Sequence, residues 1–117
     1  MSKVTIYHNP RCTKSRQTLA LLQAQGIEPQ IIEYLNTPPS SARLDELLKA
    51  MGKEPIEVMR TKEATFKELG LSKQDDRPRK EWLQLMVKNP ILIERPIVVK
   101  GKKAALGRPP EQVLEIL

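Results

Sequence analysis

The sequence predicts an α/β fold in which a mixed β-sheet is interrupted by an all-helical insertion. Three observations lead to this: short β-branched runs near both ends, apolar residues at helical spacing in the middle, and Pro or Gly at the borders between them. A chain of 117 residues has the length of one domain with a single core. We therefore expect one domain over residues 1–117, with the insertion at about residues 38–89.

The first 35 residues predict a β-α-β unit. The segment Lys3–Tyr7 alternates and is rich in β-branched residues, as strands are. A turn at Asn9-Pro10 follows, and apolar residues then recur at helical spacing over Thr13–Gly26, where the glycine ends the helix. The run Gln30–Tyr34 predicts a second strand. This order places Cys12 at the junction between a strand and a helix.

Residues 38–89 predict only helices. Leucines and a methionine recur at helical spacing between Ser41 and Gly52. Shorter helical segments fit residues 56–59, 65–69 and 75–89, and the last of these stops at Asn89-Pro90. We find no repeat and no flexible linker, so the insertion is expected to belong to the same domain.

The end of the chain, from the apolar run Ile91–Ile93 onward, is expected to return to β-structure. Pro96–Lys100 and Lys103–Leu106 predict a hairpin around Gly101, and a closing helix follows Pro109-Pro110. The order β-α-β, helices, β-β-α matches a thioredoxin-like three-layer layout. Such folds place a cis-proline beside the active-site cysteine, so we expect the Arg95–Pro96 bond to be cis.

Composition excludes several classes of function. The formal net charge is +6, but the basic residues are dispersed and aromatic residues make up only 3% of the chain, which is too few for a base-stacking surface. No nucleic-acid partner is therefore expected. No apolar run is long enough to span a bilayer, and the segment Met1–Ile6 lacks a signal-peptide core. These features predict a cytoplasmic protein without membrane contact.

The chain contains one cysteine, Cys12, which excludes an intramolecular disulfide and a cysteine-based zinc site. A lone cysteine is often an inert core residue. Cys12 differs because a helix begins there, and free N–H groups at a helix N-terminus stabilise a thiolate. We expect His8, Arg11, Lys14 and Arg16 to add positive charge. Cys12 is therefore predicted to be a nucleophile, and no metal site is implied.

Ser15 occupies the place of the second cysteine in a Cys-x-x-Cys motif. The thiolate therefore has no resolving partner in the chain and needs an external thiol. His8 supports Cys12 in one interpretation and only fills the turn in another. No acyl-transfer motif accompanies the cysteine and histidine. A phosphatase loop is excluded because Thr18 stands where that loop needs arginine.

Six ordered blocks of sequence carry a resemblance to a known family. They are residues 6–16, 34–39, 59–62, 67–71, 89–99 and 106–110. Together they resemble the glutaredoxin-coupled (ArsC-type) arsenate reductases over essentially the whole chain. The resemblance implies that Cys12 forms a thiol–arsenate adduct, that Arg60, Arg95 and Arg108 bind the oxyanion, and that His8 and Ser15 support them. It also implies glutathione as co-substrate, glutaredoxin as partner, no bound cofactor and a monomer.

Two alternatives remain beside an arsenate reductase. One is a thiol-sensing transcription regulator that binds RNA polymerase, which Ser15 disfavours because many such regulators use a Cys-x-x-Cys switch. The other is a general glutathione-linked thiol oxidoreductase. The three arginines favour the oxyanion enzyme, because guanidinium groups offer forked donors to a tetrahedral anion and disulfide chemistry needs none.

Overall fold

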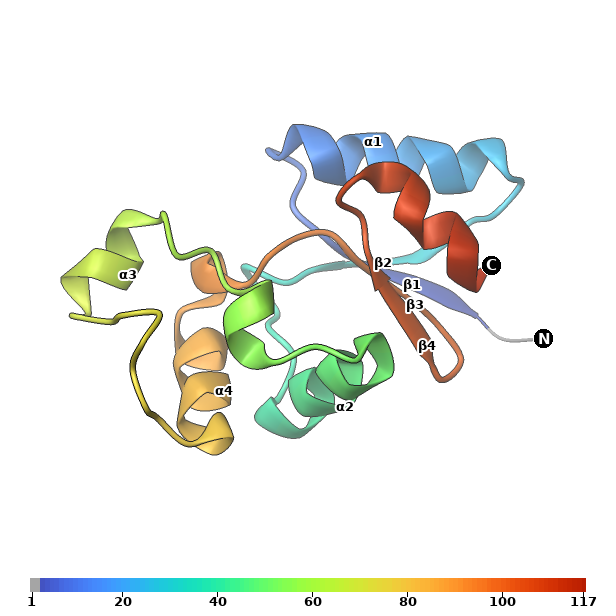
Figure 1. Ribbon diagram of the computed structural model, residues 1–117. Coiled ribbons are helices and arrows are strands. Elements are labelled where there is room, and N and C mark those ends of the chain that lie inside the picture. Colours follow the sequence, from blue (N-terminus) through green and yellow to red (C-terminus); the bar gives the residue numbers. More distant parts are fainter. Residues whose placement is uncertain (1–2) are drawn as a thin grey trace. The chain divides into compact units, whose positions relative to one another are not determined.

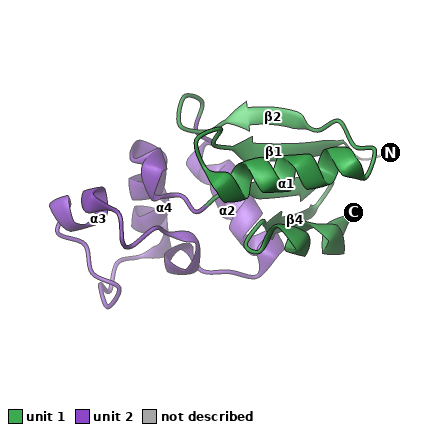
Figure 2. Cartoon of the chain, turned by 90° about the horizontal axis from the view of Figure 1, so that it is seen from above, with its two compact units in different colours: residues 1–37, 95–117 green, residues 38–94 purple. Residues whose placement is uncertain are grey.

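The computed structural model describes residues 3–117; Met1 and Ser2, the start of the segment examined for a signal peptide, lie outside it. The chain forms two compact units (Figure 2). Unit 1 combines the residues up to 37 with residues 95–117, and unit 2 comprises residues 38–94. Within the described residues, no helix is both long and apolar enough to cross a membrane.

Unit 1 contains a mixed four-stranded sheet. Its strands are β1 (Val4–His8), β2 (Gln30–Glu33), β3 (Ile97–Lys100) and β4 (Lys103–Leu106), in the order β2-β1-β3-β4. Strand β1 is parallel to β2 and antiparallel to β3, and β3 and β4 form the expected hairpin. The predicted α/β class with a mixed sheet is thus confirmed.

Two helical elements cover one face of this sheet, the α-helix α1 (Thr13–Ala24) and the 3-10 helix η3 (Pro110–Ile116) (Figure 1). The core between these helices and the sheet contains alternate residues of β1 and β3 and one residue from each helix: Val4, Ile6, Leu22, Val98 and Val113. Alternation works because successive strand side chains point to opposite faces. The same packing fixes the start of α1 beside the end of β1, where Cys12 lies.

The buried side of α1 changes character along its length. Leu22 is buried at its C-terminal end, whereas the buried residues nearer Cys12 are Ser15 and Thr18. These three positions share one helical stripe at i, i+3 and i+7. Buried polar side chains need hydrogen-bond partners. Ser15 contacts His8 and the N–H of Asn9, and Thr18 donates to the carbonyl of Lys14.

Unit 2 is helical, as predicted for the insertion. It contains α2 (Ser41–Met51), η1 (Pro55–Val58), α3 (Ala64–Glu68), α4 (Arg79–Lys88) and η2 (Pro90–Leu92). The Ser40 hydroxyl accepts the N–H of Arg43 at 3.1 Å and caps α2, and Gly52 ends that helix with φ +67°. A single β-bridge joins Met59 to Ile93.

The structure corrects two sequence predictions and refines a third. Residues 90–92 form a 3-10 helix rather than β-structure, because Pro90 at a first helical position loses no hydrogen bond. Helix α4 begins at Arg79 and not at 75, since a residue before Pro78 is disfavoured in helical conformation. The closing helix is of 3-10 type. The cis bond at Arg95–Pro96 is confirmed, and a second one at Arg108–Pro109 was not expected.

Replacement of Leu22 by alanine tests the core of unit 1. Leu22 is fully buried in the cluster formed with residues of β1, β3 and η3. We therefore expect Leu22→Ala to lower the free energy of unfolding by about 2–5 kcal/mol. Leu114 in η3 is 39% exposed, and Leu114→Ala should cost less than about 1 kcal/mol. Chemical denaturation of both variants checks this. Equal losses would contradict the assigned core.

Candidate active site around Cys12

A tight turn between β1 and α1 presents Cys12. The N–H of Cys12 donates to the carbonyl of Asn9 at 3.0 Å, and the N–H of Arg11 donates to Asn9 Oδ1 at 3.0 Å. Pro10 favours such a turn because its φ is fixed and it has no backbone N–H that would need an acceptor. Cys12 itself is the N-cap of α1, with extended backbone angles of φ −96° and ψ 124°. Its side chain therefore lies at the N-terminus of the helix.

Ser15 connects this turn to β1. The side chain is fully buried, and its Oγ lies 2.6 Å from Nδ1 of His8 and accepts the N–H of Asn9 at 3.0 Å. With a neutral imidazole, the Ser15 hydroxyl can donate to Nδ1 while its lone pairs accept the Asn9 N–H. The serine that replaces a second cysteine is thus a hydrogen-bonding centre of the loop.

His8 does not supply the positive charge expected of it. Burial is the main cause that lowers the pKa of His8 below 6.5; the carboxylate of Glu33 opposes this and the charge of Arg16 adds to it. A histidine with a pKa below its ordinary value is mostly neutral at neutral pH. His8 is therefore linked to the turn that presents Cys12 through the hydrogen bonds of Ser15, and its supporting role remains a prediction.

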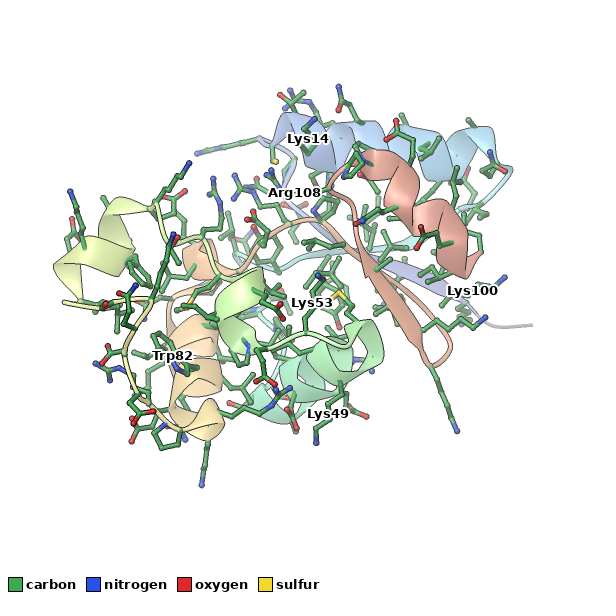
Figure 3. The ribbon with its side chains drawn as sticks, in the orientation of Figure 1. Lys14, Lys49, Lys53, Trp82, Lys100 and Arg108 are labelled. Atoms are coloured by element: carbon green, nitrogen blue, oxygen red, sulfur yellow. The ribbon has the colours of Figure 1, made fainter. Side chains whose placement is uncertain are left out.

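Two arginines from distant parts of the sequence reach Cys12. Nη2 of Arg108 lies 3.9 Å from the Cys12 sulfur, and its Nε donates to the carbonyl of Arg95 at 2.9 Å. Arg108 lies in the segment between β4 and η3, near the first turn of α1, where Lys14 is labelled (Figure 3). Arg95 lies just before β3, and its charge also acts on the sulfur. Within unit 1 the fold thus joins Cys12 to Arg95 and Arg108.

Arg95 has donors without acceptors. Across residues 3–117, its Nε and Nη1 are buried and have no hydrogen-bond partner. Buried donors left unpaired are costly, by about 1–3 kcal/mol each. Such donors on a fixed cation beside a thiolate are suited to receive the oxygens of an anion.

The pKa of Cys12 is lowered below the ordinary value of a thiol. Burial, the largest single influence, would raise it. The N–H of Ser15, the charge and hydrogen bond of Arg95 and the N–H of Lys14 act in the opposite direction and together outweigh burial. The thiolate thus depends on helix N–H groups and on Arg95 rather than on the basic side chains adjacent in sequence.

Arg60 belongs to unit 2. Its guanidinium pairs with the carboxylates of Glu63 and Glu94. The backbone N–H of Arg60 donates to the carbonyl of Leu92 at 2.7 Å. These contacts hold the Arg60 side chain in a defined position within unit 2. The role that the resemblance gives to Arg60 remains a prediction.

The site also contains a residue that the sequence did not single out. Asn9 was predicted only as a turn residue, yet its backbone and side chain make three of the hydrogen bonds that shape the loop. The Asn-Pro pair was the available signal. Among the described residues, no group of three or more His, Cys, Asp or Glu side chains could hold a metal ion.

Comparison with known proteins agrees with this geometry. The model of the ArsC family matches residues 7–116, nearly the entire chain. The chain belongs to the ArsC family. The fold and the motif around Cys12 are those that this family membership leads one to expect, so the resemblance inferred from the sequence blocks is confirmed.

Individual ArsC relatives match along their full length. The chain is 53% identical over 116 residues to YfgD of Escherichia coli (strain K12), a protein described as uncharacterized, and this covers 98% of the chain and 97% of YfgD. It is 47% identical to an arsenate reductase of Haemophilus influenzae, covering 97% and 98%. The solved structure of an arsenate reductase from Vibrio cholerae superposes with a TM-score of 0.93 at 51% identity, covering 99% and 98%.

The rate of Cys12 alkylation against pH tests the thiolate. A lowered pKa means that the thiolate is present at lower pH than in a free thiol, so the rate should reach half its plateau below about 8.5. Arg95→Met removes one cause of the lowering and should shift the midpoint upward. Arg43→Met, an exposed arginine in unit 2, is the control and should not move it. A wild-type midpoint at or above the free-thiol value would contradict the assignment.

Proposed function

We propose that this protein reduces arsenate to arsenite through a covalent adduct on Cys12, with glutathione and glutaredoxin as reductants. Family membership and relatives named arsenate reductase support the activity. The observation that carries the proposal is a pair of buried Arg95 donors, without a partner among residues 3–117, beside a thiol whose pKa is lowered. The Arg95 donors can bind an anion, and the adjacent Cys12 thiolate can act on it as a nucleophile.

The first step is a displacement at arsenic. The Cys12 thiolate forms a sulfur–arsenic bond while one arsenic–oxygen bond breaks, and the oxygen leaves as water after protonation. Arsenic remains in the +5 state. Arg95 and Arg108 hold the remaining oxygens, and their charge offsets the repulsion between a thiolate and an oxyanion. The lowered pKa of Cys12 increases the fraction of nucleophilic thiolate at a given pH.

The reduction itself requires two electrons, which two thiols supply when they form a disulfide. Cys12 is the only cysteine of the chain, so at least one thiol comes from outside. In our proposal, the glutathione thiolate forms a second sulfur–arsenic bond while another arsenic–oxygen bond breaks and that oxygen leaves as water. The glutaredoxin thiolate then attacks the glutathione sulfur, so that the bond between this sulfur and arsenic breaks, its electron pair reduces arsenic to the +3 state, and a glutaredoxin–glutathione disulfide forms. Hydrolysis of the remaining bond between Cys12 and arsenic releases arsenite and returns Cys12 as a thiolate. The general chemistry is thiol exchange.

The proposal also includes the cellular compartment of the reaction and the number of chains that form the site. Glutathione keeps thiols reduced in the cytosol, where disulfides rarely persist, so the protein is proposed to act in the cytoplasm. Cys12, Arg95 and Arg108 come from one chain, which fits a monomer. The role of Arg60 in oxyanion binding is part of the proposal and rests on the resemblance alone.

A coupled assay tests the function. Arsenate-dependent oxidation of NADPH is followed with glutathione, glutaredoxin and glutathione reductase present. We expect turnover in the wild type and none in Cys12→Ser, because a hydroxyl is a far weaker nucleophile at neutral pH. Omission of glutaredoxin should stop multiple turnover. A wild type that turns over disulfides but not arsenate would favour a general thiol oxidoreductase, and inertness toward every oxyanion would favour a polymerase-binding regulator.

The arginines can be tested by variants that keep their charge. Arg95→Lys and Arg108→Lys retain a cation but lose the fork of donors. Loss of one charge-assisted hydrogen bond, worth roughly 1.5–3 kcal/mol, should lower kcat/KM by about tenfold to a hundredfold. The melting temperature should change little, because neither residue packs in the core. Steady-state kinetics and thermal melts measure both quantities.

Arg43→Lys serves as the matched control because Arg43 is an exposed arginine of unit 2. Its kinetics should equal those of the wild type. Arg60→Lys is measured in the same series, and the proposed role predicts a loss of the same order. Unchanged kcat/KM in both Arg95→Lys and Arg108→Lys would exclude these arginines as the oxyanion receptor.

A further inference from the structure

Gly107 lies directly before Arg108 and makes an unusually close contact. We propose that Gly107 is a positioning residue, which sets the distance between the arginines and Cys12 by allowing three segments to meet where no side chain fits. The inference rests on the proposed function of Cys12, Arg95 and Arg108. It assigns to Gly107 no contact with substrate.

Steric crowding is the first observation. A Cβ atom at residue 107 would lie 2.6 Å from Oγ1 of Thr18 and 2.7 Å from Cγ of Pro96. Carbon atoms in ordinary contact are about 3.5–4.0 Å apart. At Gly26, Gly52 and Gly70, by contrast, an added Cβ atom would have no neighbouring heavy atom within 4 Å. Residue 107 therefore has to be glycine, because its neighbours leave no room for a Cβ atom.

Both neighbours are held in place. Thr18 is fully buried on α1, and its Oγ1 donates to the carbonyl of Lys14 at 2.8 Å. On the opposite side, the N–H of Gly107 donates to the carbonyl of Pro96 at 2.8 Å. A side chain at residue 107 could not be accommodated by rotation of a flexible group. It would instead displace one backbone segment from another.

The three segments that meet at Gly107 are those that carry the site. Helix α1 carries Cys12, residue 96 follows Arg95, and residue 107 precedes Arg108. The Nε of Arg108 bonds to the carbonyl of Arg95, so displacement of one arginine is transmitted to the other. Relief of contacts this short needs a movement of several tenths of an ångström or more. Misplacement of catalytic groups by about 1 Å can cost on the order of a hundredfold in rate.

The test compares Gly107→Ala with Gly26→Ala. Gly26 has φ +77°, so an alanine there is strained by its backbone but meets no neighbour. We expect Gly107→Ala to lower kcat/KM for arsenate by tenfold to a hundredfold, because both arginines are displaced. It should also raise the pKa of Cys12, because Arg95, whose charge lowers that pKa, moves away from the sulfur. Gly26→Ala should lower the melting temperature and leave both quantities unchanged. Wild-type values of both in Gly107→Ala would overturn the proposal.

Removal of the obstructing atom provides the second arm. Thr18→Ala deletes Oγ1 but leaves the contact with Pro96, so the double variant Thr18→Ala/Gly107→Ala should recover part, but not all, of the lost kcat/KM. Its Cys12 pKa should likewise return only part of the way to the wild-type value. Thr18→Val keeps the bulk, so Thr18→Val/Gly107→Ala should not recover. Equal behaviour of the two double variants would overturn the steric account.

Two further comparisons keep the result interpretable. If Gly107→Ala does not fold, the same measurements are made in the Thr18→Ala background, where the short contact with Oγ1 is gone and the contact with Pro96 remains. The double variant must then show a higher Cys12 pKa than Thr18→Ala alone, and equal values would refute the role. The pKa is measured without arsenate, so failure of arsenate turnover in the wild type would count against the proposed function and not against the positioning of Cys12.

Discussion

The need to keep a charged sulfur in a mostly buried position governs the structure of this protein. Cys12 is only 8% exposed, and burial alone would favour its neutral form. The thiolate is stabilised because helix N–H groups and a guanidinium are already in place before any substrate arrives. Each of these groups depends on a different part of the fold. The first turn of α1 supplies the N–H groups of Lys14 and Ser15, and the segments beside β3 and β4 supply the arginines.

The same requirement explains the polar front of α1. Ser15 and Thr18 occupy core-facing positions where apolar residues would add more hydrophobic stabilisation. Ser15 instead binds His8 and the turn, and Thr18 lies against Gly107. The helix thus gives up some hydrophobic stabilisation, and its polar side chains instead fix the positions of groups at the site. This pattern is common where proteins position reactive groups. Because the pKa of His8 is lowered, the positive charge beside the sulfur comes from Arg95 and Arg108.

The sequence predicted local features well. Alternation and helical spacing located β1, α1, the β3–β4 hairpin and the helical insertion, because each depends on residues close in sequence. The N-cap position of Cys12 followed from the same patterns. The site was less predictable, because Arg95 and Arg108 meet Cys12 only through sheet pairing across more than 80 residues, and the resemblance rather than periodicity pointed to them. The lowered pKa of His8, the orphan donors of Arg95 and the contact at Gly107 depend on burial and distance, which no pattern of residue types encodes.

The central claim is that the fold forms an oxyanion receptor beside the Cys12 thiolate before chemistry begins. Protection of Cys12 from iodoacetamide by arsenate, in the absence of any thiol reductant, tests it most directly. The account predicts that alkylation of the wild type slows saturably as arsenate is added, and that the double variant Arg95→Met/Arg108→Met shows no such protection at the same thiolate fraction. An alkylation rate that does not depend on arsenate in the wild type, or equal protection in the double variant, would contradict it.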